Sequence, residues 1–465
     1  MRYEQVKSNS AMTTCALVVL LASHCGVVRA AELSAEEKAL LGTTLTEIGA
    51  EKAGNQDGTI EAFEWGKYKI PSSYEMGSGS RVDVVEGESP RLSIDAGNMA
   101  QHADQLTEGT KAMLTKYSST FRLDVYPTHR TVSFPEWLLK RTKELAGTAV
   151  LSADGIALSN IHAAVPFPIP KSGIEAVWNH LTRFEGVRLN GRYTNHNVDA
   201  SGKSTVSTAA LIDQQYPYWD LSKDSVNNYF VFKIFYFAPP RRNGEIILGL
   251  DPFDFSKQGR RVLQYLPGQR RVKLAPELSF DTPNPGTGGV ANWDDGWMFN
   301  GSPERFDWTL VGKKEMYVMY NNCTVQFKNP PQELVGKDHL NPDKVRWELH
   351  RVWVVEGKLK QGKRHNYHRR LFYLDEDSWS LVATDSFDAR GELYRTNFAL
   401  GCALYDSGFP NSAVFFSGTE AHIDLIADNW TMQALPGPDG YWKMYPDLLP
   451  DNEFTADSIA GSGLR

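Results

Sequence analysis

The stretch VRWELHRVWVVEGKLKQG (residues 345–362) decides the fold class, together with HNYHRRLFYLDEDSW (365–379) and SLVATDSFDARGELYRTNFAL (380–400). Apolar residues alternate with polar ones or run together in each stretch, and glycine or aspartate separates the stretches. This pattern is typical of antiparallel strands joined by tight turns. Hairpin turns are expected at 357–362, 375–378 and 388–391.

The strand pattern extends towards the N-terminus as far as about residue 201. NNYFVFKIFYFAPP (227–240) has the same texture, so the sequence predicts a β-meander over about 201–430. The preceding part, about 31–200, favours helices, and both parts are expected in a single domain covering 31–465. The sequence therefore predicts the α+β class.

Three segments before residue 200 have helical patterns. Apolar residues at helical spacing predict helices over 96–117 and 134–145. A third helix is predicted over 173–184, where Ser172 and Glu175 form the sequence signature of a capping box.

A hairpin rich in arginine lies between the central strands. Pro267-Gly268 predicts a tight turn whose arms carry Arg260-Arg261-Val262 and Arg270-Arg271-Val272. Arg270 and Arg271 are neighbours on a strand, so at most one of them faces a groove and can hold an acidic headgroup. The alternative is that both lie on a solvated face and pair with carboxylates.

Large aromatic side chains follow this hairpin. They offer more apolar area than a turn-rich loop needs, so they cap a core, line a cavity or face a partner. With the two arginines, they make up the predicted ligand-binding residues: Trp293, Trp297, Phe299, Arg270, Arg271, Trp308 and Tyr317.

The N-terminus has the organisation of a signal peptide. Arg2 and Lys7 precede an apolar run from Cys15 to Val28, and cleavage is expected after Ala30. This run is too short for a membrane span. The formal net charge of −7 argues against a nucleic-acid partner.

Only Cys323 and Cys402 remain after residue 30. Two cysteines are too few for a disulfide scaffold, but they can form one bridge in an oxidising compartment. Sequence does not give their Cα separation, so a bridge and two free buried thiols both stay open.

Motifs for cofactors and metals are incomplete. Gly202-Lys203-Ser204 resembles the end of a phosphate loop, but Asn197 stands where the first glycine belongs. A calcium loop would begin at Ala53, which has no carboxylate. We therefore expect no cofactor, no metal and no catalytic residue.

One enzymatic alternative remains. Asp294-Asp295 lies beside Trp293 and Trp297, which resembles the acid-plus-aromatic arrangement of a glycan site. A hydrolase of envelope lipid or glycan is therefore kept as an alternative function.

Six stretches in collinear order resemble a known family. They are NQDGTIEAFEWG (55–66), VPFPIPKSGIEAVWNH (165–180), YLPGQRRVKLAP (265–276), DDGWMFNGSPERFDWTLVGKKEMYV (294–318), RWELHRVWVVEGKLK (346–360) and RRLFYLDEDSW (369–379). The family is an exported Gram-negative one of unknown function, often labelled outer-membrane lipoprotein-sorting protein. It is similar to the periplasmic lipoprotein carriers.

The resemblance implies a fold and a function. The fold is a large curved antiparallel sheet, a half-barrel, wrapped over a few helices. The function is a periplasmic carrier that binds a lipid, acyl chain or lipoprotein and exchanges it with an inner-membrane exporter or an outer-membrane acceptor. A structural envelope protein with an aromatic interface is the third alternative.

Overall fold

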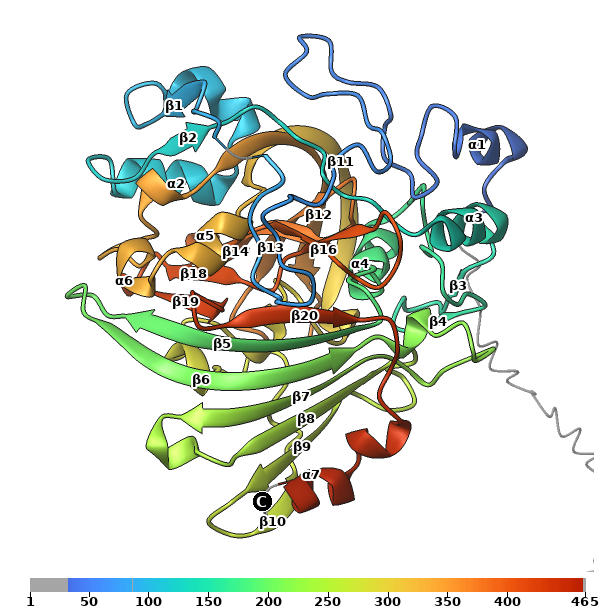
Figure 1. Cartoon of the computed structure of the whole chain (residues 1–465), viewed down its shortest axis with the longest axis vertical. Helices are drawn as coiled ribbons and strands as arrows, with labels where there is room; N and C mark the ends of the chain where they lie inside the picture. Colours follow the sequence, from blue (N-terminus) through green and yellow to red (C-terminus); the bar gives the residue numbers. More distant parts are fainter. Residues whose placement is uncertain (1–31, 86, 463–465) are drawn as a thin grey trace, which may run out of the picture.

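The computed structural model describes residues 32–85 and 87–462. Their main element is one large open antiparallel sheet, accompanied by a few short helices (Figure 1). This confirms the predicted α+β class with a curved antiparallel sheet. The predicted signal peptide, residues 1–30, lies outside the described residues.

Sixteen strands of the described chain form the large sheet. They are β1 (Leu92–Ile94), β2 (Leu123–Val125), β5 (Arg188–Val198), β6 (Ser204–Gln215), β7 (Asn228–Ala238), β8 (Ile246–Pro252), β9 (Arg261–Leu266), β10 (Arg271–Leu274), β11 (Phe306–Met319), β12 (Trp347–Leu359), β13 (Arg369–Asp375), β14 (Leu381–Phe387), β15 (Leu393–Ala399), β18 (Glu420–Asp424), β19 (Asn429–Leu435) and β20 (Tyr441–Tyr445).

The strands are ordered β1-β2-β12-β13-β14-β15-β18-β19-β5-β6-β7-β8-β9-β10, with β11 on β12 and β20 on β5. Consecutive strands pair as hairpins from β5 to β10 and from β11 to β15. β18 and β19 extend the second run beyond β15, and β19 pairs with β5 to join the two runs. A continuous chain of local hairpins therefore builds most of the sheet, and the turns predicted at 375–378 and 388–391 lie between strands as expected. The turn predicted at 357–362 is wrong in position, because Gly357 still pairs with Arg370 within β12 and the chain connects to β13 over residues 360–368.

Two small sheets and the helices complete the structure. The small strands are β3 (Val150–Leu151), β4 (Leu158–Ser159), β16 (Cys402–Tyr405) and β17 (Ala413–Phe416). The helices are α1 (Ala35–Leu40), α2 (Glu108–Lys116), α3 (Glu136–Leu145), α4 (Gly173–Leu181), α5 (Cys323–Lys328), α6 (Pro331–Leu334) and α7 (Ala456–Ser462). None of the described helices combines the length and the apolar character that crossing a membrane requires.

The helix predicted over 96–117 is interrupted. The structure has a 3₁₀ segment, η1 (Met99–Gln105), and then α2, with extended backbone at Leu106 between them. The side chain of Thr107 accepts a hydrogen bond from the backbone N–H of Thr110 and caps a new helix. Apolar spacing continues across this break, so periodicity alone did not reveal it.

The third predicted helix exists, but its capping box does not form. Ser172 precedes α4 and makes no side-chain cap hydrogen bond. The carboxylate of Glu175 instead accepts a hydrogen bond from the backbone N–H of Lys171. The helix begins at Gly173, as predicted, and ends at Leu181.

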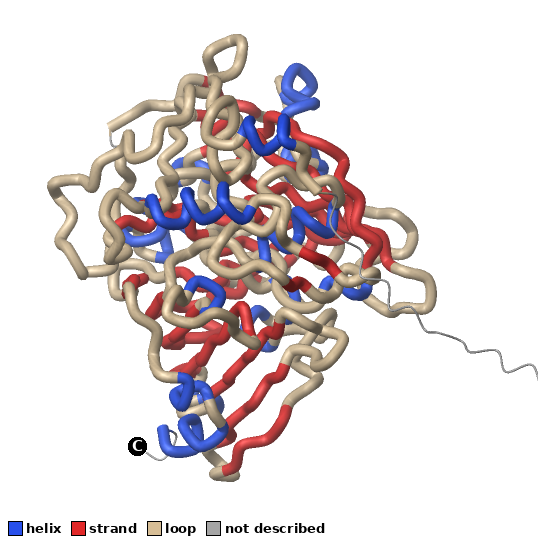
Figure 2. Tube along the Cα trace, turned by 90° about the vertical axis from the view of Figure 1, so that its right-hand side faces the viewer, coloured by secondary structure: helices blue, strands red, loops and turns tan. Residues whose placement is uncertain are grey.

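The two halves of the sheet are buried differently. Every residue of β14 is buried, because α2 packs on β14 and β15 while other segments cover the opposite face. In β6 buried residues alternate with half-buried ones from Ser207 to Gln214, as expected for a sheet with one face inward. Figure 2 shows the lower strands as a thinner layer with α7 beside them.

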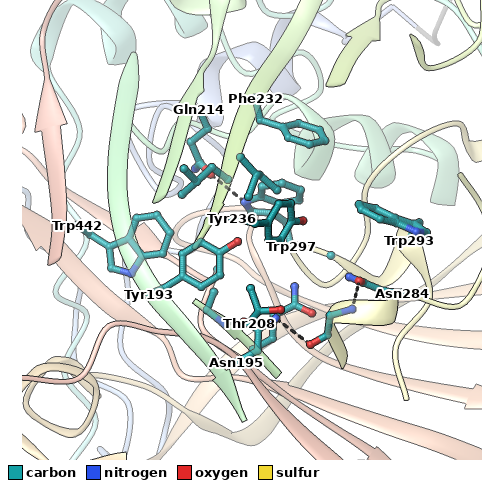
Figure 3. Close-up of a pocket in the computed structure, with 17 residues that line it drawn as sticks. Tyr193, Asn195, Thr208, Gln214, Phe232, Tyr236, Asn284, Trp293, Trp297 and Trp442 are labelled. Carbon is teal, nitrogen blue, oxygen red and sulfur yellow. Dashed lines mark hydrogen bonds between the residues drawn. The ribbon is translucent and has the colours of Figure 1, made fainter. Parts of the chain in front are cut away.

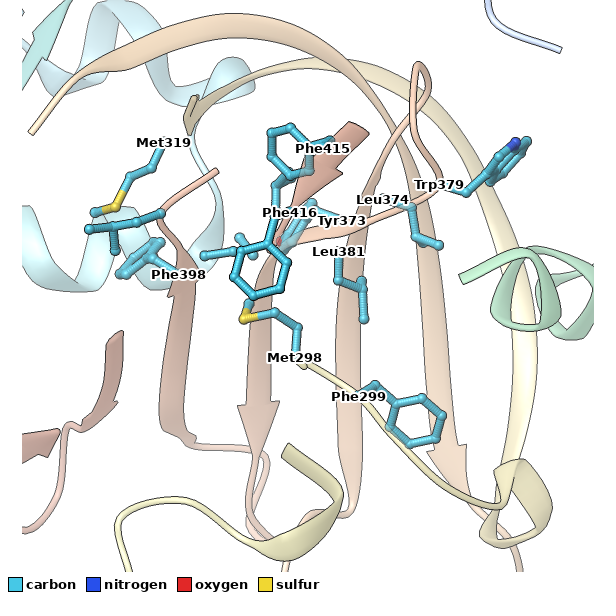
Figure 4. Close-up of a cluster of buried hydrophobic side chains, with 14 of the residues drawn as sticks. Met298, Phe299, Met319, Tyr373, Leu374, Trp379, Leu381, Phe398, Phe415 and Phe416 are labelled. Carbon is cyan, nitrogen blue, oxygen red and sulfur yellow. The ribbon is translucent and has the colours of Figure 1, made fainter. Parts of the chain in front are cut away.

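The main core draws residues from both halves of the sheet. Figure 4 shows Met298 and Phe299, which follow a loop, next to Tyr373, Leu381 and Phe398 from β13, β14 and β15. A separate small cluster joins β7–β9 to the C-terminal residues Phe454 and Ile459. β7 is therefore apolar on both faces, which explains its continuous apolar sequence.

A disulfide bridge joins Cys323, the first residue of α5, to Cys402 in β16. The Cα atoms are 4.8 Å apart and the cysteines are 79 residues apart in sequence. The bridge ties the segment after β11 to the small sheet that follows β15.

Replacing both cysteines by alanine should lower the free energy of unfolding by about 2–5 kcal/mol, because the unfolded chain loses a long closed loop. Urea unfolding followed by circular dichroism measures this change. Wild type with reductant should match the double variant, and equal midpoints for oxidised wild type and the variant would contradict the account.

Candidate functional site

A closed cavity lies on the inner face of β5, β6 and β7 (Figure 3). The segment 284–297 covers it, and residues of β19 and β20 complete the wall. Its volume is about 60 Å³. Pockets that hold drug-sized ligands have volumes of about 300–1,000 Å³, so this cavity is much smaller than such pockets.

The lining comes mainly from alternate positions of three neighbouring strands. In β7, Phe232, Ile234 and Tyr236 point to the cavity because successive side chains alternate between faces. The remaining lining residues are Tyr193, Asn195, Thr208, Ile212, Gln214, Asn284, Gly286, Trp293, Gly296, Trp297, Gly418, Gln433, Ala434 and Trp442.

Phe232 and Trp297 form the apolar end of the cavity. Their ring centroids are 5.2 Å apart, and the ring centroid of Phe230, on the same face of β7, lies 5.0 Å from that of Trp297. A Cβ atom at Gly249 in β8 would lie 2.3 Å from the ring of Phe232. Glycine at this position lets the ring lie directly on the neighbouring strand.

The closing segment is held in an unusual backbone conformation. Trp297 and Met298 have φ angles of 54° and 66°, a left-handed region that bulky residues rarely occupy. Two hydrogen bonds hold them, from Trp297 Nε1 to Gln214 Oε1 (3.2 Å) and from the backbone N–H of Met298 to Glu420 Oε1 (2.9 Å). Strained conformations persist where surrounding contacts over-determine them.

A buried ion pair anchors the same segment. Arg370 Nη1 lies 3.0 Å from Asp294 Oδ2 and Nη2 lies 2.8 Å from Asp295 Oδ1. His365 Nε2 is 3.0 Å from Asp294 Oδ2, and the hydroxyl of Tyr367 donates to Asp295 Oδ2 at 2.8 Å. Burial alone would raise the pKa of Asp294, but His365 and Arg370 outweigh it and hold the pKa well below its usual range.

These contacts give Asp294 and Asp295 a structural role. Both carboxylates are buried, and each pairs with the guanidinium of Arg370. The acid-plus-aromatic pattern in the sequence therefore arises from the anchor of a loop, with the carboxylates directed at β13.

The cavity itself carries no formal charge. Its described lining contains no Asp, Glu, Lys, Arg or His. Burial raises the pKa of Tyr193 well above its usual value, and burial also raises that of Tyr236 despite the opposing effect of Arg242. Both phenols are therefore neutral at physiological pH.

The structure brings two of the seven predicted site residues into the cavity, Trp293 and Trp297. Phe299 instead packs in the core, with its ring centroid 5.2 Å from that of Phe372. Trp308 and Tyr317 belong to β11, where Trp308 Nε1 donates to Pro303 O and the ring of Tyr317 lies edge-on to His102.

The two predicted arginines lie at the far edge of the sheet. Arg270 is in the turn between β9 and β10 with φ of 48°, and Arg271 is the first residue of β10. Both side chains are exposed, and neither belongs to the cavity lining. The predicted hairpin itself forms, with Arg271 opposite Leu266.

Sequence reasoning missed the lining residues of β5, β6 and the C-terminal strands, such as Tyr193, Thr208 and Trp442. Once NNYFVFKIFYFAPP is assigned as a strand, side-chain alternation places Phe232, Ile234 and Tyr236 on one face, but its nearly continuous apolar sequence does not show which face lines a cavity. No local signal marks Thr208 or Trp442, because the cavity forms between segments more than 200 residues apart.

Within the described ranges, His350, Asp375 and Asp377 form a possible metal-binding group, with donor atoms within 4.8 Å of one another. Arg130 Nε already donates to Asp377 Oδ2 at 2.8 Å, and His350 Nε2 lies 3.0 Å from Glu348 Oε2. The guanidinium occupies the position of a counter-cation. We therefore interpret the group as an internal ion-pair network.

A second hollow lies on the surface between α3 and the segment around Phe409. It is open, with a volume of about 540 Å³, and its lining mixes Trp65, Trp137 and Phe409 with charged Lys69 and Glu136. An open, partly charged groove shields an apolar molecule from water less completely than the closed cavity does.

Residues 93–460 match a family described as "Protein of unknown function (DUF1329)". The chain belongs to this family. The uncharacterized protein PA3922 of Pseudomonas aeruginosa is 35% identical over 439 residues, which cover 94% of this chain and 95% of that protein. The family resemblance found in the sequence is therefore confirmed.

Solved structures of low identity also resemble this DUF1329 chain. A DUF1329 family protein from Desulfovibrio piger has a TM-score of 0.41 at 13% identity, covering 61% of this chain and 95% of its own. A putative outer membrane lipoprotein-sorting protein domain from Vibrio parahaemolyticus gives 0.41 at 14%, with 62% and 98% covered. The LolA superfamily protein NE2245 from Nitrosomonas europaea gives 0.37 at 10%, with 62% and 98% covered.

Neighbouring arginines in β13 offer a matched test of the anchor. Arg370→Ala should lower the free energy of unfolding by about 3–5 kcal/mol, because it leaves buried carboxylates without their counter-charge. Arg369→Ala removes an arginine whose side chain is 39% exposed and should cost less than about 1 kcal/mol. Urea unfolding at pH 7 compares the two, and equal losses would refute the anchoring role.

Proposed function

We propose that this protein binds a hydrophobic molecule in the cavity between β5–β7 and the 284–297 segment, and carries it through the periplasm. The supporting observation is a closed, uncharged cavity walled by Phe232, Ile234, Trp293, Trp297 and Trp442. Each methylene transferred from water into such a site contributes about 0.8 kcal/mol. An acyl chain therefore gains substantial affinity without a polar recognition code.

The closed volume requires the closing segment to move. A cavity of about 60 Å³ does not hold a whole acyl chain. Trp297 is the moving part in this proposal, because it forms the wall opposite Phe232 and is held by one side-chain hydrogen bond and a strained backbone. Its displacement joins the cavity to the space that the indole now fills.

The composition of the cavity favours carriage over the hydrolase alternative at this place. Among the described lining residues no His, Cys, Asp or Glu is available to act as a general base. The cavity therefore offers burial and hydrogen bonding. In this proposal the protein receives the hydrophobic molecule from, or delivers it to, an inner-membrane exporter or an outer-membrane acceptor.

Two variants with opposite expected effects test the site. Trp297→Ala enlarges the cavity and should tighten binding of the neutral fluorescent probe N-phenyl-1-naphthylamine. Ile212→Trp fills the cavity and should weaken binding of the same probe at least about tenfold, which corresponds to about 1.4 kcal/mol of binding free energy. Fluorescence titration of delipidated protein measures both, with thermal unfolding as a check on folding.

The opposite signs separate the cavity from general damage, because both substitutions cost stability, at about 1–5 kcal/mol each. Equal weakening in both variants would contradict the cavity as the site. Binding that survives Ile212→Trp and is lost in Phe409→Ala would assign the probe to the outer groove.

A further inference from the structure

Several polar atoms of the cavity lining have no hydrogen-bond partner in the described protein. They are Thr208 Oγ1, Gln433 Oε1, Trp293 Nε1 and Trp442 Nε1, all fully buried as atoms. Thr208 and Trp442 are only 1% and 2% exposed as whole residues. Buried polar groups without a partner are rare in folded proteins, because each costs about 1–3 kcal/mol.

Three polar lining residues gather at one end of the cavity. Figure 3 shows Asn195, Thr208 and Asn284 together, with Phe232 and Gln214 at the opposite end. A Cβ atom at Gly286 would lie 3.1 Å from both Thr208 Oγ1 and Asn284 Oδ1, so these groups surround the same glycine. The cavity is therefore amphipathic, with a polar end and an aromatic end.

The polar end is fixed in place by its own hydrogen bonds. Asn195 Nδ2 donates to Gly286 O at 3.2 Å, and Asn195 Oδ1 accepts from the backbone N–H of Ala434 at 2.8 Å. Asn284 Oδ1 accepts from the backbone N–H of Gly286 at 2.9 Å. These bonds engage the asparagines and leave the hydroxyl of Thr208 available beside them.

The unpartnered atoms around the cavity include both donors and acceptors, and Figure 3 shows Trp442 and Trp293 on opposite sides with Thr208 between them. The two indole N–H groups need an acceptor, Gln433 Oε1 needs a donor, and the Thr208 hydroxyl can serve as either. A hydroxyl or a primary amide supplies both kinds, whereas an alkane supplies neither and an ester supplies only an acceptor.

The lack of a free positive charge beside the polar end narrows the class of ligand further. Arg242 stacks 3.6 Å from the ring centroid of Tyr236, but Glu245 holds its Nε and Nη2 at 2.7 and 3.1 Å and neutralises it. No cation among the described lining residues faces the polar end. Burying a carboxylate or phosphate there without a counter-charge costs several kcal/mol.

We infer that the cavity selects an apolar molecule whose polar group is uncharged and both donates and accepts hydrogen bonds, such as a long-chain alcohol or a primary amide. This inference rests on the proposed function and specifies its ligand class. The hydroxyl of Thr208 binds the polar group, and the chain extends towards Phe232 and Trp297.

The test compares ligands of equal chain length. Isothermal titration of delipidated full-length protein with 1-octanol, octanamide and octanoate at pH 8 should show the alcohol and the amide binding at least about tenfold more tightly than the anion, a difference of about 1.4 kcal/mol. At pH 4 the carboxyl group is largely protonated, since its pKa is about 4 to 5, and the gap should narrow.

Two threonines in β6 provide matched variants. Thr208→Val keeps the side-chain shape, removes the hydroxyl and should weaken 1-octanol binding by about 2- to 12-fold, the equivalent of one hydrogen bond of about 0.5–1.5 kcal/mol. Thr205→Val makes the same change at an exposed position outside the cavity and should leave binding unchanged.

The outcomes separate this inference from the proposed function. Octanoate binding as tightly as octanol at pH 8, or a Thr208→Val affinity equal to that of wild type, would overturn the ligand class while leaving an apolar site intact. Failure of the octyl ligands and of N-phenyl-1-naphthylamine alike would overturn the proposed function as well.

Discussion

The buried pairing of Arg370 with Asp294 and Asp295 is the interaction on which the cavity depends. Taking three charges out of water is costly, and their mutual attraction offsets the cost only when the geometry satisfies every charge. The guanidinium in β13 reaches both carboxylates, His365 shares Asp294 Oδ2 with it, and the hydroxyl of Tyr367 donates to Asp295 Oδ2. Asp294 Oδ1 has no hydrogen-bond partner among the described residues. This demanding geometry fixes the closing segment in one position, so that Trp297 closes the cavity.

The sheet provides a rigid side and a thinner side for this arrangement. β13 and β14 belong to the half that is covered on both faces, so the anchor is attached to a close-packed core. β5–β7 form the other wall of the cavity. The closing segment joins the two halves of the sheet. Asp294 and Asp295 pair with Arg370 in β13, and Trp293 and Trp297 line the cavity against β5–β7. The anchor at Asp294 and Asp295 and the strained backbone at Trp297 and Met298 lie within five consecutive residues, so the ion pair directly supports the conformation that places Trp297 in the cavity wall.

Much of the fold could be predicted from local signals, because most strand pairs are hairpins between neighbours. The Pro267-Gly268 turn and the runs from 345 to 400 predicted antiparallel strands, and the family resemblance implied that the sheet is curved. The break at Leu106 was missed because Thr107 caps a new helix without disturbing apolar spacing. The disulfide stayed open because its 4.8 Å Cα separation is a property of the folded chain.

The candidate site was less accessible to sequence reasoning. Trp293 and Trp297 stood out because aromatic side chains are dense in that stretch, and they do line the cavity. Arg270 and Arg271 also stood out, but the β9–β10 turn places them at the sheet edge. Whether a side chain reaches the cavity depends on which strands lie beneath the closing segment. That arrangement follows from the pairing of β19 with β5, two strands more than 200 residues apart.

Native mass spectrometry of the protein, purified without detergent from its own cells, tests the central claim most directly. The account predicts a discrete added mass that organic extraction removes, and that Ile212→Trp protein purified in the same way lacks. An unmodified mass for wild type, or the same added mass in both proteins, would contradict a ligand-binding cavity at this site.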